Sequence, residues 1–105
     1  MSSGRYLWAI LGMALTLSAV PAYAETIQVT IANLDFSPKE INAKVGDTIE
    51  WINKDVLVHS ATVRGDWNLT IAPGKSASQV LSKAGAFDYF CIFHPNMKGH
   101  ITVAQ

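Results

Sequence analysis

One stretch near the end of this 105-residue chain reads Tyr89-Phe90-Cys91-Ile92-Phe93-His94-Pro95-Asn96-Met97-Lys98-Gly99. It holds a thiol, an imidazole and a thioether at a Cys-x2-His-x2-Met spacing. Just before it, Phe87, Tyr89 and Cys91 share one parity, which predicts a strand that ends at Cys91. We expect the next strand to begin after Gly99, so that the intervening loop folds three potential metal ligands around one point.

Most of the chain upstream of this stretch alternates apolar and polar side chains with a period of two. The alternation is clearest around Ile27–Ile31, Ile41–Val45 and Ile49–Trp51, and it returns at Ile101–Val103. β-Branched and aromatic residues in such a pattern are typical of half-buried strands. Turn signals separate the segments at Ser37-Pro38, Gly46-Asp47, Asn53-Lys54-Asp55, Arg64-Gly65-Asp66, Pro73-Gly74 and Ala84-Gly85.

These patterns predict an all-β fold, a small antiparallel sandwich or barrel without a long helix. Thr30–Phe36 should contain the end of a strand and a bend. Asp66–Ser78 is the least patterned segment, and we expect a loop there with at most one short strand.

The beginning of the chain has the pattern of a secretory signal peptide. Arg5 precedes an apolar run from Tyr6 to Val20, and Ala22-Tyr23-Ala24 is a small-x-small cleavage site. The alternative is a membrane anchor, but the run is short compared with the roughly 20 apolar residues of a membrane span. We therefore predict a cleaved signal peptide at residues 1–24 and one small exported domain at 25–105, not inserted in the membrane.

The charge balance and the cysteine content restrict the possible partners and the possible roles of Cys91. The chain has 8 basic and 8 acidic residues without a basic stripe, which argues against nucleic acid as a partner. Cys91 is the single cysteine, so it cannot form a disulfide within the domain. An unpaired thiol in an oxidising compartment needs burial, a bound metal or a partner chain.

A fourth candidate ligand, His59, lies beyond the strand that carries Trp51, and antiparallel folding can bring it beside the loop. Two His, one Cys and a weak axial Met form the blue-copper ligand set, whereas zinc sites more often use two or more Cys or leave an open position. Taken singly, Cys91 could be a buried structural thiol, Met97 core filler and His59 an ordinary surface histidine. Their joint occurrence favours copper. His100 should point away from the core and is not assigned to the site.

In these residues the sequence resembles the cupredoxin family, and within it the amicyanins and the pseudoazurin-like proteins. The resemblance rests on the short Cys-x2-His-x2-Met loop, Val45–Asn53 and Gly85–Cys91. It implies a Greek-key β-sandwich of about seven to eight strands and a location in the periplasm. It also implies one type 1 copper ion with His59, Cys91 and His94 as equatorial ligands, Met97 as the long axial ligand, and a His94 edge that reaches the surface.

The chain also departs from that family. Ser60 follows the first histidine ligand, where the family usually has an Asn that ties the two ligand loops, and the segment from His59 to Cys91 is shorter. The family's methylamine dehydrogenase partner is therefore not carried over to this chain.

The predicted function is transfer of single electrons between redox proteins by a monomeric carrier. Side chains fill all ligand positions, which argues against an enzyme. Phe90, Ile92 and Phe93 are expected to keep the site dry. Transient docking is expected near His94, on Phe93, Pro95 and Val56–Val58, although Val56–Val58 could instead pack under the loop. Two alternatives remain: copper delivery or tolerance with the same ligands, and a metal-free structural domain with an inert Cys91.

Overall fold

The computed structural model describes residues 23–105, so the predicted signal peptide lies almost entirely outside the described residues. All regular elements in this part of the chain are strands. It contains no helix long and apolar enough to cross a membrane. The nine strands are β1 (Thr26–Ala32), β2 (Asp35–Ser37), β3 (Glu40–Lys44), β4 (Thr48–Asn53), β5 (His59–Val63), β6 (Trp67–Ile71), β7 (Ser76–Val80), β8 (Gly85–Cys91) and β9 (His94–Ala104).

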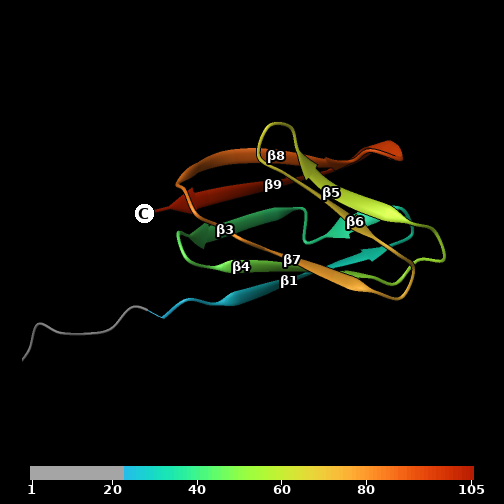
Figure 1. Cartoon of the computed structure of the whole chain (residues 1–105), viewed down its shortest axis with the longest axis horizontal. Helices are drawn as coiled ribbons and strands as arrows, with labels where there is room; N and C mark the ends of the chain where they lie inside the picture. Colours follow the sequence, from blue (N-terminus) through green and yellow to red (C-terminus); the bar gives the residue numbers. More distant parts are fainter. Residues whose placement is uncertain (1–22) are drawn as a thin grey trace, which may run out of the picture.

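The strands form two sheets packed face to face (Figure 1). One sheet has the order β2-β1-β4-β7 and the other the order β3-β9-β8-β5-β6. The predicted all-β sandwich is confirmed, with one strand more than expected. The expectation that all strands pair in antiparallel fashion is wrong, because β1 pairs with β4 and β3 pairs with β9 in parallel. In both cases the chain forms at least one strand of the opposite sheet between the two partners, so no hairpin joins them.

The inner faces of the two sheets supply the core, as the period of two predicts. In β4, Ile49 and Trp51 are fully buried, while the alternating residues Thr48, Glu50 and Ile52 are partly exposed. Trp51 meets the ring of Tyr89 edge-on across the sandwich, with 5.4 Å between the ring centroids. Gly99 lies opposite Tyr89 in the β8–β9 pair, and a Cβ there would fall 2.3 Å from the Tyr89 ring. The glycine therefore makes room for the aromatic ring at the centre of the second sheet.

The segment Asp66–Ser78 differs from the prediction, since it contains most of two strands in place of a loop. β6 pairs with β5, and β7 pairs with β4. Both lie at an edge of their sheet, where half of the side chains face solvent and polar residues are tolerated. Their weak hydrophobic pattern reflects this position. The bend expected within Thr30–Phe36 is confirmed by the two-residue turn between β1 and β2.

Candidate metal centre

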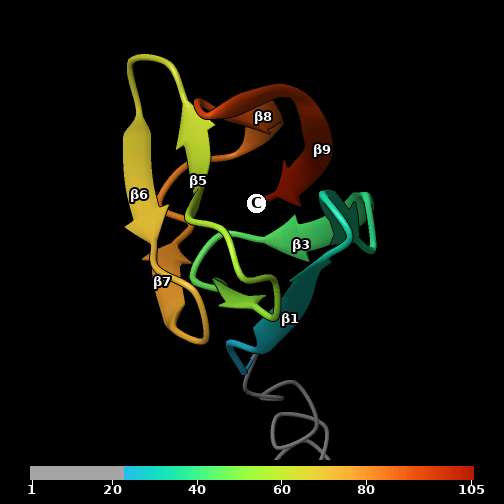
Figure 2. The same cartoon turned by 90° about the vertical axis from the view of Figure 1, so that its right-hand side faces the viewer.

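Three of the four predicted ligands lie where strands begin or end. His59 is the first residue of β5, Cys91 the last of β8 and His94 the first of β9. All three lie at the end of the sandwich opposite the C-terminus, the end that faces the viewer in Figure 2. β5 and β8 are neighbours in one sheet, which brings His59 beside the β8–β9 turn despite the distance along the chain.

The strand after the turn begins at His94, not after Gly99 as predicted. Cys91 pairs with His94, whereas Phe90 already pairs with Lys98. The residues between His94 and Lys98 therefore have no counterpart on β8 and bulge out of the ladder. Such bulges re-aim side chains beside functional sites. Here the bulge contains Met97.

The ligand atoms of His59, Cys91 and His94 lie within 4.8 Å of one another, the one such His/Cys/Asp/Glu cluster in residues 23–105. The Cys91 sulfur is 3.6 Å from Nδ1 of His59 and 3.8 Å from Nδ1 of His94. Cys91 and His59 are fully buried, and His94 is partly exposed. The structure thus brings the two imidazoles and the thiol together, and His94 alone of the three reaches the surface.

Met97 is 4% exposed, so its thioether is held inside the protein. It lines a hollow of about 380 Å³ together with His94 and residues of the surrounding loops. Met97 therefore lies beside His94 on the side of the cluster formed by the β9 bulge.

His59 is oriented through its second ring nitrogen. Its Nε2 lies 2.8 Å from Oδ2 of Asp55, which leaves Nδ1 facing the Cys91 sulfur. Asp55 also accepts hydrogen bonds from the backbone amides of Leu34 and Asn33. The Leu34 amide is the largest influence holding the pKa of this carboxyl below its usual range, with the His59 ring adding to it against partial desolvation.

The turn pattern around Asn53-Lys54-Asp55 places Asp55 but does not indicate this role. The signal available in the sequence was its position four residues before a candidate ligand. Ligand histidines usually donate their other ring N–H to a carboxylate or carbonyl, which fixes the ring and raises its basicity.

Ser60 connects the two ligand-bearing segments. Its backbone N–H donates to the Cys91 sulfur at 3.3 Å, and its side-chain oxygen accepts from the Ile92 amide at 2.9 Å. The hydroxyl thus ties the start of β5 to the turn after Cys91. Ser60, at the position where the resemblance implies an Asn, therefore keeps a link between the two loops.

Exposed apolar side chains lie in the segments next to the candidate ligands, and Leu34 and Phe93 line a hollow together with His94. We define the apolar rim as Leu34, Val56, Leu57, Val58, Ile92 and Phe93, which are 36% to 88% exposed. Val56–Val58 is therefore exposed, and the alternative that it packs under the loop is wrong. Ile92 and Phe93, which were expected to keep the site dry, are 41% and 46% exposed, so each covers the site only in part. His59 and Cys91 are buried by the sandwich interior.

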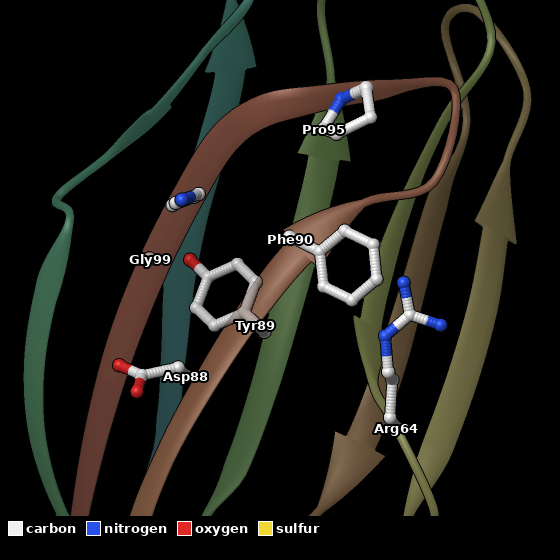
Figure 3. Close-up of a pocket in the computed structure, with 7 residues that line it drawn as sticks. Arg64, Asp88, Tyr89, Phe90, Pro95 and Gly99 are labelled. Atoms are coloured by element: carbon white, nitrogen blue, oxygen red, sulfur yellow. The ribbon is translucent and has the colours of Figure 1, made fainter.

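A second hollow, of about 540 Å³, lies on the outer face of β8 and β9 (Figure 3). Arg64 is stacked on Phe90 there, 4.7 Å from the ring centre. The candidate ligands are not among its lining residues. His100 is also outside the cluster, as predicted: it is partly exposed and bonds to Asp88.

The donor set fits copper. One thiol and two imidazole nitrogens at these separations match the trigonal His₂Cys arrangement of a type 1 site, and Met97, which lines the same hollow as His94, is the candidate weak axial ligand. Zinc has no comparable preference for a thioether and would take more thiolates or keep an open position. The arrangement is suited to one type 1 copper ion.

Comparisons with known proteins agree with this geometry. The model of the cupredoxin-like domain family matches residues 5–103. Amicyanin of Paracoccus denitrificans is 34% identical over 84 residues, which are 73% of this chain and 64% of the relative. Plastocyanin of Prochlorothrix hollandica is 32% identical, with 85% and 81% of the two chains covered.

Among solved structures, the reduced Cu(I) form at pH 4 of an amicyanin mutant superposes with a TM-score of 0.66 and 32% identity. The match covers 82% of this chain and 87% of that one. The two-sheet topology, the ligand cluster and the family match over nearly the whole chain lead to one conclusion. This chain is a member of the cupredoxin family.

Proposed function

We propose that this protein carries single electrons with one type 1 copper ion held by His59, Cys91, His94 and Met97. The observation that carries the proposal is the cluster of two Nδ1 atoms and one sulfur within 4.8 Å, drawn from three strand ends. Bound copper supplies a one-electron Cu(II)/Cu(I) couple. Asp55, Ser60 and the β9 bulge hold the ligands in place, so that little rearrangement accompanies the change of charge.

Side chains fill every ligand position in this assignment, which leaves no place for a substrate to bind to the metal. We therefore propose that the protein is a carrier and not an enzyme. The ring edge of His94 is the route by which the electron leaves, because it is the partly exposed ligand. A redox protein docks transiently on the apolar rim, whose exposed side chains suit a small, weak interface.

The same proposal includes export. Residues 1–24 act as a signal peptide, residues 25–105 form the mature domain, and the domain works in the periplasm as a monomer. A free, buried Cys91 is compatible with an oxidising compartment once it is a metal ligand.

The first experiment is the absorption spectrum of the copper-loaded protein. The wild type should be intensely blue, because a Cys91 thiolate bonded to Cu(II) gives a strong charge-transfer band. Cys91→Ser should abolish the band while the metal-free domain keeps its β-structure by circular dichroism. His100→Ala is the matched control at a histidine outside the cluster and should leave the band intact. A colourless wild type, or a Cys91→Ser variant that keeps the band, contradicts the ligand assignment.

Copper delivery remains the second candidate because it uses the same ligands. Fast, reversible voltammetry with copper retained supports the carrier. Sluggish electron exchange combined with ready loss of Cu(I) to a competing chelator supports delivery instead.

A further inference from the structure

A line of hydrogen bonds leads from the metal centre to the surface across β5 and β6. Ser60 Oγ accepts from the Ile92 amide at 2.9 Å and lies 2.9 Å from Thr62 Oγ1. Thr62 Oγ1 donates to Oδ1 of Asn68 at 2.7 Å. Ser60 and Thr62 are 0% and 6% exposed, and Asn68 lies opposite Thr62 on the edge strand β6. We call Ser60, Thr62 and Asn68 the hydroxyl relay.

The outermost member of the relay sets the direction of its protons. A carbonyl oxygen such as Asn68 Oδ1 only accepts, and each hydroxyl has a single proton to donate. The Thr62 proton therefore goes to Asn68, and the Ser60 proton goes to Thr62. A lone pair of Ser60 Oγ is left facing the Ile92 N–H, next to Cys91.

The direction of these hydrogen bonds affects the surroundings of Cys91, whose sulfur accepts a hydrogen bond from the Ser60 backbone N–H at 3.3 Å. Without Thr62, the Ser60 hydroxyl has no acceptor. Without Asn68, the Thr62 hydroxyl is free to reverse and donate to Ser60. In both cases the Ser60 proton is free to turn toward the β8–β9 turn. The Ile92 amide would then lose its acceptor. Both changes add potential donors next to the sulfur, and hydrogen bonding around this sulfur is one of the factors that tune the potential of such a site.

We propose that Thr62 and Asn68 are positioning residues of the copper centre, which act through Ser60 to fix the donors around the Cys91 sulfur. The inference rests on the copper assignment above and extends it to two residues that do not touch the ligands. It assigns a role to an exposed edge-strand residue, Asn68, whose replacement should be tolerated by the fold.

The test uses Asn68→Ala and Thr62→Val, which break the relay without changing charge. Amide exchange at Ile92 should become about tenfold faster in the metal-free and Cu(I) proteins, the factor for loss of one ordinary hydrogen bond. The Cu(II)/Cu(I) potential should shift upward in both variants, because extra donors to the thiolate favour the reduced form. If Thr62→Val fails to fold, Asn68→Ala carries the test.

Two further variants check the mechanism. Asn68→Asp keeps acceptor oxygens opposite Thr62, so Ile92 exchange should stay within about twofold of the wild type. Thr70→Ala changes the exposed residue opposite Ser60 on the same face of β6, whose side chain makes no hydrogen bond to the relay, and should alter neither the exchange rate nor the potential.

The outcomes separate this inference from the proposed function. A blue wild type whose Asn68→Ala and Thr62→Val variants keep the wild-type exchange rate or potential overturns the inference alone. Equal exchange rates in Asn68→Asp and Asn68→Ala overturn the proposed direction. A colourless wild type contradicts the copper assignment, and the positioning role with it.

Discussion

The two ends of β4 are built in the same way but serve different purposes. At its beginning, Asp47 is 2% exposed and accepts from the Glu25 and Lys44 amides, both at 2.9 Å, with the Lys44 ammonium at 3.3 Å. Just beyond its end, Asp55 accepts from two amides of the β1–β2 turn and from His59. Each carboxylate ties loop amides to the sandwich and has one further cationic or hydrogen-bonding partner.

We call the Asp47 end of β4 the Asp47 corner and the Asp55 end the Asp55 corner. The two corners differ in the further partner of the carboxylate, and this difference makes one structural and the other functional. At the Asp47 corner it is a lysine at the surface, so the carboxylate serves only the fold. At the Asp55 corner it is a candidate copper ligand, so the same device also fixes an imidazole. A carboxylate that completes a loop can thus become part of a metal centre by exchange of a single neighbour.

The corner near the metal also carries backbone strain that the other corner lacks. Asn33 and Leu34 both have positive φ, 54° and 59°, in the two-residue turn between β1 and β2. Positive φ at both positions suits a type I′ hairpin turn, although leucine rarely adopts it. The two amides of this turn are the ones that Asp55 accepts, so the carboxylate holds the strained turn against the His59 loop.

The largest expected effect concerns Asn53, the buried residue between β4 and the His59 loop. Its side-chain amide donates to the carbonyls of Leu57 and Ile71, and its Oδ1 accepts from the Asp55 amide. Asn53→Leu leaves these groups without partners, each costing about 1–3 kcal/mol. We expect a loss of about 3 kcal/mol in the free energy of unfolding of the metal-free protein, measured by urea denaturation.

The control for this prediction is Asn42→Leu on the exposed side of β3, which should change the free energy of unfolding by less than about 0.5 kcal/mol. Similar losses in the two variants would show that the polar connections of Asn53 contribute nothing specific to the corner.

The second expected effect is on copper affinity. Asp55→Asn removes the charged acceptor of His59 Nε2, and loss of such a partner typically lowers metal affinity about 10–100-fold. Competition with a calibrated copper chelator measures the change. Asp47→Asn, the matched substitution at the other corner, should leave copper affinity within about twofold. Equal weakening by both substitutions would contradict the functional difference between the corners.

Much of the fold and of the site could be predicted because it depends on local patterns. The period of two located β1, β4 and β8, and the Cys-x2-His-x2-Met spacing selected ligands that carry their chemistry in their side chains. The edge strands β6 and β7 were missed, since their polar outward residues resemble those of a loop and only pairing with β5 and β4 makes them strands.

The surroundings of the ligands could not be predicted for a related reason. Asp55, Asn53 and Thr62 acquire their roles from partners that the chain brings near only after folding. As isolated residues they are ordinary turn and strand residues. The exposure of Ile92 and Phe93 likewise depends on how tightly the chain turns after Cys91, which the spacing alone left open.

The smallest expected effect tests the Asp47 corner by pH. The Glu25 and Lys44 amides are the main influences that hold the pKa of Asp47 below its ordinary value of 3.8. A carboxyl with a lowered folded-state pKa stabilises the fold at pH values above its unfolded pKa, and this contribution is lost as the pH falls through the folded value. Asp47→Asn should therefore be less stable than the wild type at neutral pH, and the gap should close as the pH falls below 3.8. Urea denaturation of the two metal-free proteins from about pH 6 to about pH 2.5 measures the gap. A gap that stays constant over this range would mean that the amides bind an uncharged Asp47 equally well, and that its charge does not support this end of β4.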